Sequence, residues 1–325
     1  MRQKSDVTII IPNLNGEEFL YDCLKSIAGQ TCRCAVIIVD DGSKASSFDK
    51  AKEITEKFSD DLEIKLIRHA NNEGFASSVN TGIKLADTRY VLLLNNDTTA
   101  ENDMAEKLLN AITALKNAFS VSALMLSMND KEKIDDAGDF YCALGWAFSD
   151  GRDKPRDKFQ KRRHITSACA GAAIYDREKL VTLGLFDESH FCYLEDVDIG
   201  LRAKRAGLYN YFEPGAVVYH KGSATSGSRY NSFKTKLTTA NGIYLIYKNF
   251  PIWLIVLNSP LFLSGIIIKG IFYIKNGLGA AFFGGLIEGM GRIRNSRFER
   301  AKTVNFPRDI FLYFELLGNC IRRVF

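Results

Sequence analysis

The first 126 residues alternate short apolar runs with amphipathic segments. The apolar runs occupy residues 7–11, 35–39, 62–67, 90–94 and 121–126. Between them, apolar side chains recur at helical spacing in residues 17–28, 48–58, 75–86 and 101–116. Because strands that are apolar along most of their length are covered on both faces, this alternation predicts an α/β fold with a mostly parallel central sheet.

The later chain changes character twice. Residues 130–163 are polar and irregular, which predicts a long loop that is functional or mobile. Residues 164–175 and 216–220 resume as strands, and after residue 229 the pattern is helical over 233–247, 252–274 and 278–293. We therefore expect a catalytic-type domain over residues 1–228 and a helical, membrane-associating region over residues 229–325.

The distribution of charge along the chain, more than the net charge of +5, indicates which kind of partner or surface the protein binds. Residues 249–268 carry no charge, and the chain beyond them is mainly basic, including Arg292, Arg294 and Arg297. An apolar belt beside a basic tail is attracted to an anionic membrane surface. Nucleic acid is not expected as a partner, because the basic residues adjoin apolar helix rather than an aromatic-studded sheet.

The apolar helix around residues 252–274 is a marginal membrane span, because Asn258, Ser259 and Pro260 interrupt it and Lys269 lies inside it. Helices lying along the bilayer fit better; a single span, a packed subdomain or a homo-oligomer interface remain alternatives. Residues 1–6 are short and polar and do not resemble a signal peptide. We expect a peripheral, monotopic protein on the cytoplasmic face of the inner membrane, with its seven cysteines reduced.

Two acidic clusters stand at predicted element ends. Asn95, Asn96 and Asp97 close an apolar strand, and Glu195, Asp196 and Asp198 open a predicted helix. The structural interpretation is that the later acids offset the helix dipole while Asp198 pairs with Arg202, and that Asp97 is a turn residue. However, Glu195 and Asp196 are adjacent and cannot share one helix face, which leaves one carboxylate for other work. The clusters together suggest an enzyme that handles a metal-bound phosphate and a proton.

The ends of the first two strands exclude other nucleotide enzymes. The first strand ends in Pro12, Asn13, Leu14, Asn15 and Gly16, where a nicotinamide-dependent dehydrogenase would carry a glycine-rich phosphate turn. A sugar-phosphate nucleotidyltransferase would show a glycine- and arginine-rich loop at the same place. The second strand ends in Asp40, Asp41, Gly42 and Ser43, where acids can accept hydrogen bonds from a base or ribose.

With these blocks in place, the chain resembles glycosyltransferase family 2, and within it the rhamnosyltransferase-like branch. The resemblance runs from about residue 7 to 226 and rests on blocks in the family's order: residues 12–16, 39–43, 72–75, 95–97, 184–188 leading into 195–198, and 217–223. It implies a GT-A fold and inverting transfer of a sugar, rhamnose being one candidate, from a UDP- or dTDP-sugar. The implied acceptor is a saccharide, lipid-linked and destined for a cell-surface polysaccharide.

The resemblance also implies roles for individual residues. Asp196 matches the catalytic base, and Asp97 with His220 would hold a divalent cation, Mg²⁺ or Mn²⁺. The donor would contact Pro12, Asn13, Asn15, Asp40, Asp41, Asn72, Gly74, Asn80, Asn96 and Asp97, and the acceptor side would include Gly171, Glu195 and Asp198. Asn95 and Asn96 replace acids that many relatives keep, so the cation would rely on donor phosphates, water and His220.

Two alternatives stay open on the sequence. His220 read alone is a strand-end histidine satisfied by backbone groups. The whole chain could also be a non-catalytic, membrane-associated carbohydrate- or nucleotide-binding protein, which would have no need of Asp196. Release of nucleotide from a donor, with and without acceptor, separates that protein from an enzyme.

Overall fold

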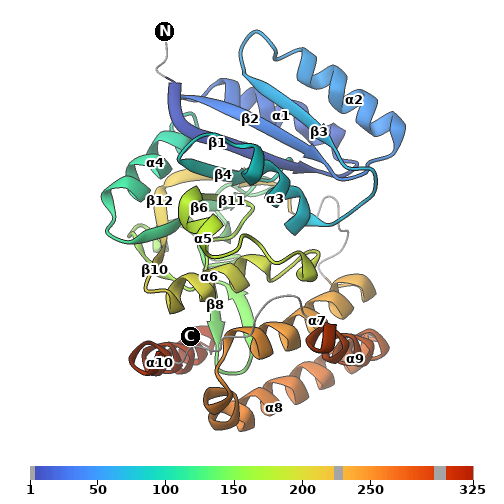
Figure 1. Cartoon of the computed structure of the whole chain (residues 1–325), viewed down its shortest axis with the longest axis vertical. Helices are drawn as coiled ribbons and strands as arrows, with labels where there is room; N and C mark the ends of the chain where they lie inside the picture. Colours follow the sequence, from blue (N-terminus) through green and yellow to red (C-terminus); the bar gives the residue numbers. More distant parts are fainter. Residues whose placement is uncertain (1–3, 223–229, 296–304, 325) are drawn as a thin grey trace.

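A twisted sheet runs through the upper part of the molecule (Figure 1). The computed structural model describes residues 4–222, 230–295 and 305–324. Along the main path of the sheet the strand order is β10-β12-β6-β11-β4-β1-β2-β3. The strands of the sheet and of the small hairpin are β1 (Lys4–Asn13), β2 (Arg33–Asp40), β3 (Ile64–Arg68), β4 (Tyr90–Leu94), β5 (Thr98–Ala100), β6 (Ala118–Ser127), β7 (Ile134–Asp136), β8 (Asp139–Cys142), β9 (Trp146–Ser149), β10 (Arg163–Ile165), β11 (Ala172–Asp176) and β12 (Tyr209–His220).

The predicted parallel sheet is confirmed. β3, β2, β1 and β4 are parallel neighbours, and β12 is parallel to β6. β11 lies antiparallel between β4 and β6, and β10 and β5 are antiparallel neighbours of β12. Residues 164–175, expected as one strand, instead form β10 and β11 with a connection between them.

Helices cover both faces of the sheet, as the continuous apolar strands require. They are α1 (Glu17–Ala28), α2 (Ala45–Glu56), α3 (Phe75–Leu85), α4 (Met104–Ala114), α5 (Arg177–Thr182) and α6 (Glu195–Arg205). Ile9 and Ile11 of β1 pack in the cluster that includes α1 and α4, whereas Ile10 packs in the cluster that includes α3 and α6. Successive side chains of a strand point to opposite faces, so β1 contributes to both cores.

The polar segment 130–163 is structured, so the loop prediction is wrong there. It forms β7, the β8–β9 hairpin and the short 3-10 helix η1 (Arg156–Lys158). Apolar residues line one side of the hairpin, where Phe140 stacks on Phe148 at a ring distance of 6.0 Å. A short hairpin among polar residues has too little apolar periodicity to be recognised in the sequence.

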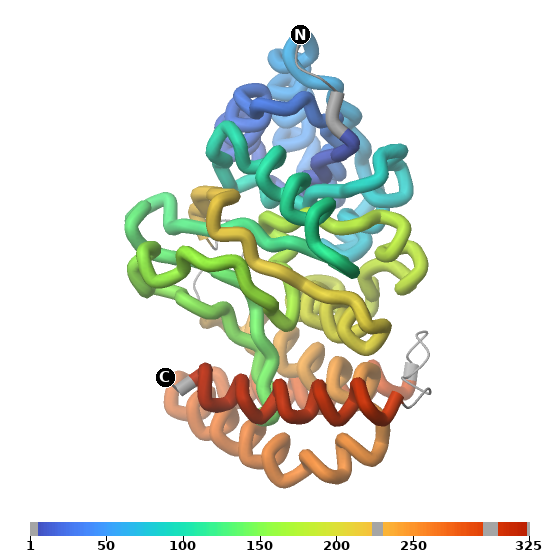
Figure 2. Tube along the Cα trace, turned by 90° about the vertical axis from the view of Figure 1, so that its left-hand side faces the viewer, coloured from blue at the N-terminus to red at the C-terminus, as the bar shows by residue number. Residues whose placement is uncertain are grey.

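A layer of helices lies beneath the sheet: α7 (Ser232–Asn249), α8 (Ile252–Lys275), α9 (Gly279–Asn295) and α10 (Phe306–Val324) (Figures 1 and 2). α10 falls inside the helical region expected over residues 229–325, although no individual helix was predicted at its position. A third apolar core joins this layer to the rest, with Leu245, Phe262 and Leu316 packing on Tyr141 and Leu201. The predicted boundary at residue 228 lies outside the described residues, but the helices share a core with the sheet domain.

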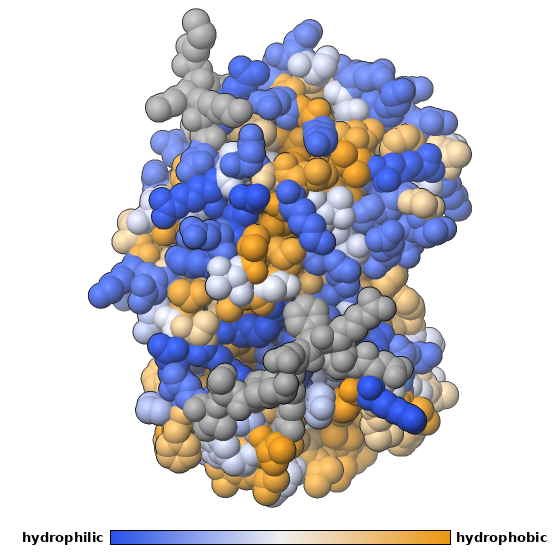
Figure 3. All heavy atoms as spheres, in the orientation of Figure 1, coloured by the Kyte–Doolittle hydropathy of each residue, from blue (hydrophilic) through white to orange (hydrophobic). Residues whose placement is uncertain are grey.

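Within the described ranges, α8 is the one helix long and apolar enough to cross a membrane by length and composition. Only 28% of its most apolar window is buried, so most of that surface faces outward. Pro260 lies inside α8 without ending it. Figure 3 shows hydrophobic side chains at the lower end of the molecule, where α8 lies in Figure 1.

Candidate active site

Two adjoining cavities open between the sheet and the helical layer. The strand-end cavity, about 830 Å³, lies at the carboxyl ends of β1, β2 and β4 and is lined by Pro12, Asn13, Asp41, Asn72, Gly74, Asn96 and Asp97, among others. The acidic cavity, about 770 Å³, is lined by Asp135, Asp136, Asp139, Gly171, Glu195 and Asp196, among others. Asn95, Tyr193 and His220 line both cavities. An open α/β sheet binds ligands at this edge.

A chain of hydrogen bonds joins the ends of the parallel strands. Asp40 accepts from the Asn13 amide at 3.0 Å and from the Ser43 backbone N–H at 3.1 Å. The Asn13 side-chain oxygen accepts from the Asn96 amide at 2.7 Å. Asp40 is fully buried and is not among the residues that line either cavity, so the structure does not bring it together with the other predicted donor residues. Asn13 and Asn96 do reach the strand-end cavity.

Asp41 fixes the loop before α3. Its carboxylate accepts from the backbone N–H groups of Glu73 at 3.0 Å and Gly74 at 2.8 Å. Asn72 also accepts from the Gly74 N–H, at 3.0 Å. Gly74 has a φ of 92°, and a Cβ there would lie 2.5 Å from the Phe191 carbonyl oxygen. Glycine is therefore required where this loop meets the segment before α6.

Two predicted donor residues lie away from these cavities. The Asn80 amide bonds the backbone of Phe186 in both directions, at 2.9 and 3.0 Å, and donates to Glu188 at 2.9 Å. Asn15 bonds Ser43 and Lys44 and borders a separate, smaller cavity. Both asparagines satisfy backbone groups of neighbouring loops, which the sequence pattern cannot distinguish from ligand binding.

Asp97 and His220 meet because of strand register. His220 ends β12 opposite Thr98 of β5, and Asp97 immediately precedes that strand. The Asp97 Oδ1 and His220 Nε2 atoms are 3.2 Å apart, and His220 Nδ1 lies 2.6 Å from Asp135 Oδ2. Burial lowers the pKa of His220, but the hydrogen bonds to Asp135 and Asp97 outweigh it and raise the pKa to about 9.

The Asp97–His220 pair would hold a divalent cation once the ion displaces the proton that His220 shares with Asp97 at Nε2. A carboxylate and an imidazole nitrogen face one cavity side by side, and the other ring nitrogen is held by a second carboxylate, Asp135. A carboxylate that orients a histidine in this way is the usual outer partner of a metal-binding histidine. The pair supplies two ligands only, so phosphate and water oxygens would complete the shell.

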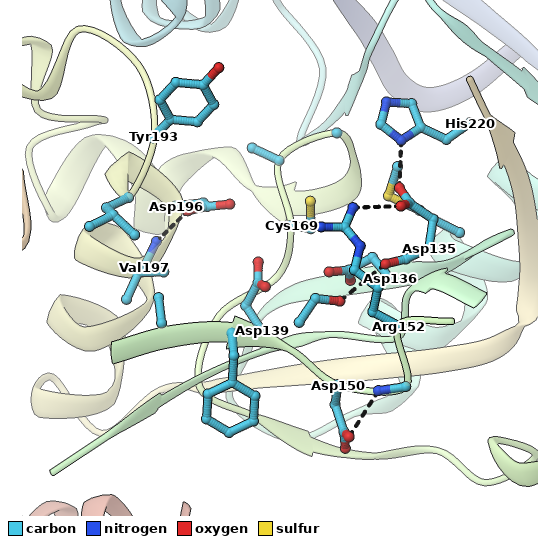
Figure 4. A pocket seen from close by; sticks show the side chains of 18 of the residues that line it. Asp135, Asp136, Asp139, Asp150, Arg152, Cys169, Tyr193, Asp196, Val197 and His220 are labelled. Atoms are coloured by element: carbon cyan, nitrogen blue, oxygen red, sulfur yellow. Dashed lines mark hydrogen bonds and ion pairs between the residues drawn. The ribbon is translucent and has the colours of Figure 1, made fainter. Parts of the chain in front are cut away.

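Asp196 opens into the acidic cavity from the first turn of α6 (Figure 4). Leu194 before the helix has a φ of 67° and Tyr193 has 69°, both in the left-handed region that disfavours side chains. Burial raises the pKa of Asp196, against hydrogen bonds from the backbone of Val197 and Ala170. Burial and the Asp196 charge raise the pKa of Glu195 well above its usual value. A raised carboxyl pKa brings a general base closer to working pH.

Asp198 is fully buried and is not among the residues that line either cavity, so the structure does not bring it together with Glu195 and Gly171 on the predicted acceptor side. Arg202 binds it at 2.7 Å, which is the structural pairing that the sequence allowed. Lys248 binds it at 2.8 Å, and the Asn249 amide donates to it at 2.7 Å. Burial opposes ionisation of Asp198, but Arg202 and Lys248 hold its pKa well below the ordinary value.

The floor of the acidic cavity is formed by residues that were not predicted as site residues from the sequence. Asp135, Asp136, Asp139 and Arg152 all come from the segment expected as a loop, and Figure 4 shows them facing the space below Asp196 and His220. Burial and the neighbouring Asp135 raise the pKa of Asp136 to about 6. Three acids within five positions, residues 135–139, were the sequence signal that could have identified this part of the site.

Gly171, predicted on the acceptor side, also lines this cavity, and its carbonyl accepts from the Asn95 N–H at 2.9 Å.

Fold and site together define a GT-A type α/β protein with polar strand ends facing a large cavity. A family model described as Glycosyl transferase family 2 matches residues 8–184, more than half of the chain. The chain belongs to glycosyl transferase family 2, and the resemblance read from the sequence is confirmed at that level.

Solved structures agree with the fold. The structure of GalNAc-T7 with UDP, GalNAc and Mn²⁺ aligns with a TM-score of 0.59 at 16% identity, covering 74% of this chain and 47% of that one. The mannosyltransferase PcManGT from Pyrobaculum calidifontis, with GDP-Man and Mn²⁺, aligns with a TM-score of 0.53 at 14% identity, covering 91% and 89%. At these identities the likeness shows the GT-A fold.

Curated relatives are similar over part of their length. A pre-mycofactocin glycosyltransferase of Mycobacterium tuberculosis is 26% identical over 215 residues, which are 66% of this chain and 42% of that protein. Glycosyltransferase GlyG of Streptococcus pneumoniae is 25% identical over 188 residues, 57% of this chain and 59% of that protein. The chain thus spans about half the length of these relatives.

Proposed function

We propose that this chain is an inverting glycosyltransferase that moves a sugar from a nucleotide sugar to a saccharide acceptor. The observation that carries the proposal is the placement of Asp196. Its carboxylate enters the acidic cavity, which adjoins the strand-end cavity where Asp97 and His220 lie 3.2 Å apart. A proton acceptor and a site for a diphosphate cation thus face one continuous space from opposite sides.

The strand-end cavity accommodates the donor. Pro12, Asn13 and Asp41 border it at the ends of β1 and β2, where a nucleoside would lie. The diphosphate would extend toward Asp97 and His220, which would hold a Mg²⁺ or Mn²⁺ ion. Such an ion neutralises the charge that develops on the leaving diphosphate oxygen. Support for a cation also comes from the Mn²⁺ named in the two aligned structures.

The acidic cavity accommodates the acceptor, with Glu195 and Gly171 on its wall. Asp196 takes the proton of the acceptor hydroxyl while the oxygen of that hydroxyl forms a bond to the donor's anomeric carbon. The bond from that carbon to the diphosphate breaks on the opposite face, which inverts the configuration. A positioned carboxylate of this kind contributes about 10²–10⁴-fold to the rate. The rhamnosyltransferase-like branch and the choice between UDP- and dTDP-sugars stay predictions.

The membrane surface is the proposed location, with a lipid-linked saccharide as acceptor. Large apolar side chains are exposed along α8, including Val256, Leu263, Ile267 and Ile271, and on α10, including Phe311 and Phe314. Exposed apolar area on this scale marks an interaction surface. The helices would lie on the cytoplasmic leaflet, with the catalytic cavities facing a saccharide carried by lipid.

Nucleotide release from purified donors tests the proposal. Each UDP- and dTDP-sugar is incubated with Mn²⁺ or Mg²⁺, with and without a saccharide-lipid extract, and free nucleotide is measured. Acceptor-dependent release with one donor supports transfer. Nucleotide binding without release under any of these conditions would favour the non-catalytic carbohydrate- or nucleotide-binding alternative.

A further inference from the structure

The segment between β11 and α6 has a strained backbone next to the proposed base. Phe191, Tyr193 and Leu194 have φ values of 62°, 69° and 67°, and Asp196 follows in the first turn of α6. Non-glycine residues keep such angles only where surrounding contacts impose them. Gly74 and α3 contact this segment at Phe191, and the helical layer, expected from the sequence as a membrane-associating region, supplies the other contacts described below.

Asn241 of α7 makes the central contact. Its side-chain amide donates to three backbone carbonyls of the strained segment: His190 at 2.9 Å, Cys192 at 2.9 Å and Tyr193 at 2.7 Å. The residue is fully buried. One NH₂ group that is shared among three carbonyls holds them at one point, which a turning backbone does not achieve by itself.

Close packing of α9 on α7 completes this contact. A Cβ at Gly285 would lie 2.5 Å from the Lys236 carbonyl oxygen, and one at Gly289 would lie 2.8 Å from that of Ala240. The glycines therefore allow α9 to approach α7 closely. Arg292, which follows Gly289 by one turn, donates to the Asn241 side-chain oxygen and, at 2.7 Å, to the Ser189 carbonyl.

The rest of the same α7 face binds the two acids that flank the segment. Tyr244 and Lys248 contact Asp187 at 2.8 and 2.7 Å, and Lys248 also contacts Asp198 at 2.8 Å. Residues 241, 244 and 248 follow one another at helical spacing, so they share one face of α7. The strained segment is thus fixed at its start, its middle and its end by one helix.

We propose that Asn241 is a positioning residue for glycosyl transfer, acting through the carbonyls of residues 190–193 to place Asp196 in the acidic cavity. The inference rests on the proposed function of Asp196. It makes the helical layer part of the catalytic unit as well as a surface for the membrane. Misplacing a reacting group by about 1 Å can cost about 10²-fold in rate, so loss of this contact should lower turnover without abolishing nucleotide binding.

The test compares two buried asparagines of the helical layer. Asn241→Asp keeps the size of the side chain and its acceptor for Arg292 but removes the donors to the loop. Asn258→Asp is the matched control, because Asn258 is also fully buried and its amide donates to a backbone carbonyl, that of Ala143 at 2.7 Å in the β8–β9 turn. Measured for each are kcat, donor KM, nucleotide affinity, unfolding temperature and amide hydrogen exchange of residues 189–194.

Asn241→Asp should lower kcat at least about tenfold, leave nucleotide affinity within about twofold and speed exchange in residues 189–194. Asn258→Asp should have a lower unfolding temperature than the wild type, without a comparable fall in kcat. Wild-type kcat in Asn241→Asp, or equal falls in both variants, would overturn the proposal. If the wild type transfers no sugar, the exchange measurement decides alone: faster exchange confined to Asn241→Asp upholds the contact while the proposed function fails, and unchanged exchange rejects both.

Discussion

Lys248 Nζ lies 2.8 Å from Asp198 Oδ2 and joins α7 to the first turn of α6 across fifty residues of chain. The lysine also contacts Asp187 at 2.7 Å, and its side chain is only 3% exposed. Two carboxylates and two cations, with Arg202 as the second, therefore neutralise one another inside the protein. Buried charges are retained only when paired in this way.

Removal of the lysine charge should destabilise the fold. We expect Lys248→Met to lower the free energy of unfolding by about 3–5 kcal/mol, because two buried carboxylates lose a partner. Urea denaturation measures the change. Lys236→Met is the control, since Lys236 pairs with Glu288 while 53% exposed and should cost no more than about 1 kcal/mol. Equal decreases in the free energy of unfolding of the two variants would show that the buried Lys248 pair stabilises the fold no more than an exposed pair does.

The depressed pKa of Asp198 predicts how stability changes in acid. Burial raises this pKa, but Arg202 and Lys248 hold it well below the ordinary 3.8. The folded state therefore binds the proton less readily than the unfolded chain, and this contribution is complete above about pH 4 and lost as the pH falls through the lower folded value. The free energy of unfolding of Asp198→Asn should be lower at neutral pH and less dependent on pH below 4. If the free energy of unfolding of Asp198→Asn depends on pH below 4 as strongly as that of the wild type, the lowered pKa of Asp198 is contradicted.

Replacement of the proposed base tests the chemistry directly. Asp196→Asn should lower kcat by about 10² or more while nucleotide binding persists, because an amide cannot accept the hydroxyl proton. Transfer kinetics and nucleotide titration give the two quantities. Glu178→Gln, which also removes an acid from the first turn of a helix, should keep wild-type turnover. Turnover near the wild-type level in Asp196→Asn would show that another group takes the proton.

Loss of the Asp97 carboxylate should weaken the response to divalent cation. In Asp97→Ala, the concentration of Mn²⁺ or Mg²⁺ that gives half-maximal activity should rise, together with the donor KM, because the diphosphate loses its anchored counter-charge. Asp103→Ala, at a partly exposed aspartate paired with Lys107, is the control. Full activity of chelator-treated wild-type protein would show that the Asp97–His220 pair holds no required ion.

The apolar face of α8 predicts membrane binding. Val256, Ile267 and Ile271 are 65%, 60% and 52% exposed. Replacing all three with Ser should reduce co-sedimentation with vesicles at least about tenfold, because each buried side chain contributes about 1.5–3 kcal/mol. The control replaces Leu85, Val181 and Tyr209, exposed apolar residues of the sheet domain, and should bind normally. Equal binding by both variants would assign the α8 face to another contact.

Electrostatic attraction to the membrane is best tested at one arginine rather than at Arg292, Arg294 and Arg297 together. Arg292 already bonds Glu288, Asn241 and the Ser189 carbonyl, so it is not simply a lipid-facing charge. Arg297 lies outside the described residues. Arg294, exposed near the end of α9, is the described arginine of this group whose replacement by Gln tests attraction to anionic lipid. Binding of that variant to anionic and neutral vesicles gives the comparison.

Much of the sheet could be predicted from the sequence, because each buried strand is a short apolar run of consecutive residues. The runs at residues 7–11 and 90–94 are buried strands whose apolar character records burial on both faces. The polar residues after them lie at one sheet edge, because parallel strands end at the same edge. Pro12, Asp41 and Asp97 therefore reach the strand-end cavity as the pattern predicted.

The tertiary structure alone decided which of the remaining polar residues face a cavity. Asp40, Asn80 and Asp198 have the residue types of a binding site, yet their side chains satisfy buried backbone groups and buried cations. Ser43 and Arg202 are local partners, but Phe186 lies 106 positions from Asn80 and Lys248 lies fifty positions from Asp198. Sequence spacing does not encode these long-range pairs. A polar side chain is used for whichever partner the packed chain brings within hydrogen-bonding reach, and only the fold determines that partner.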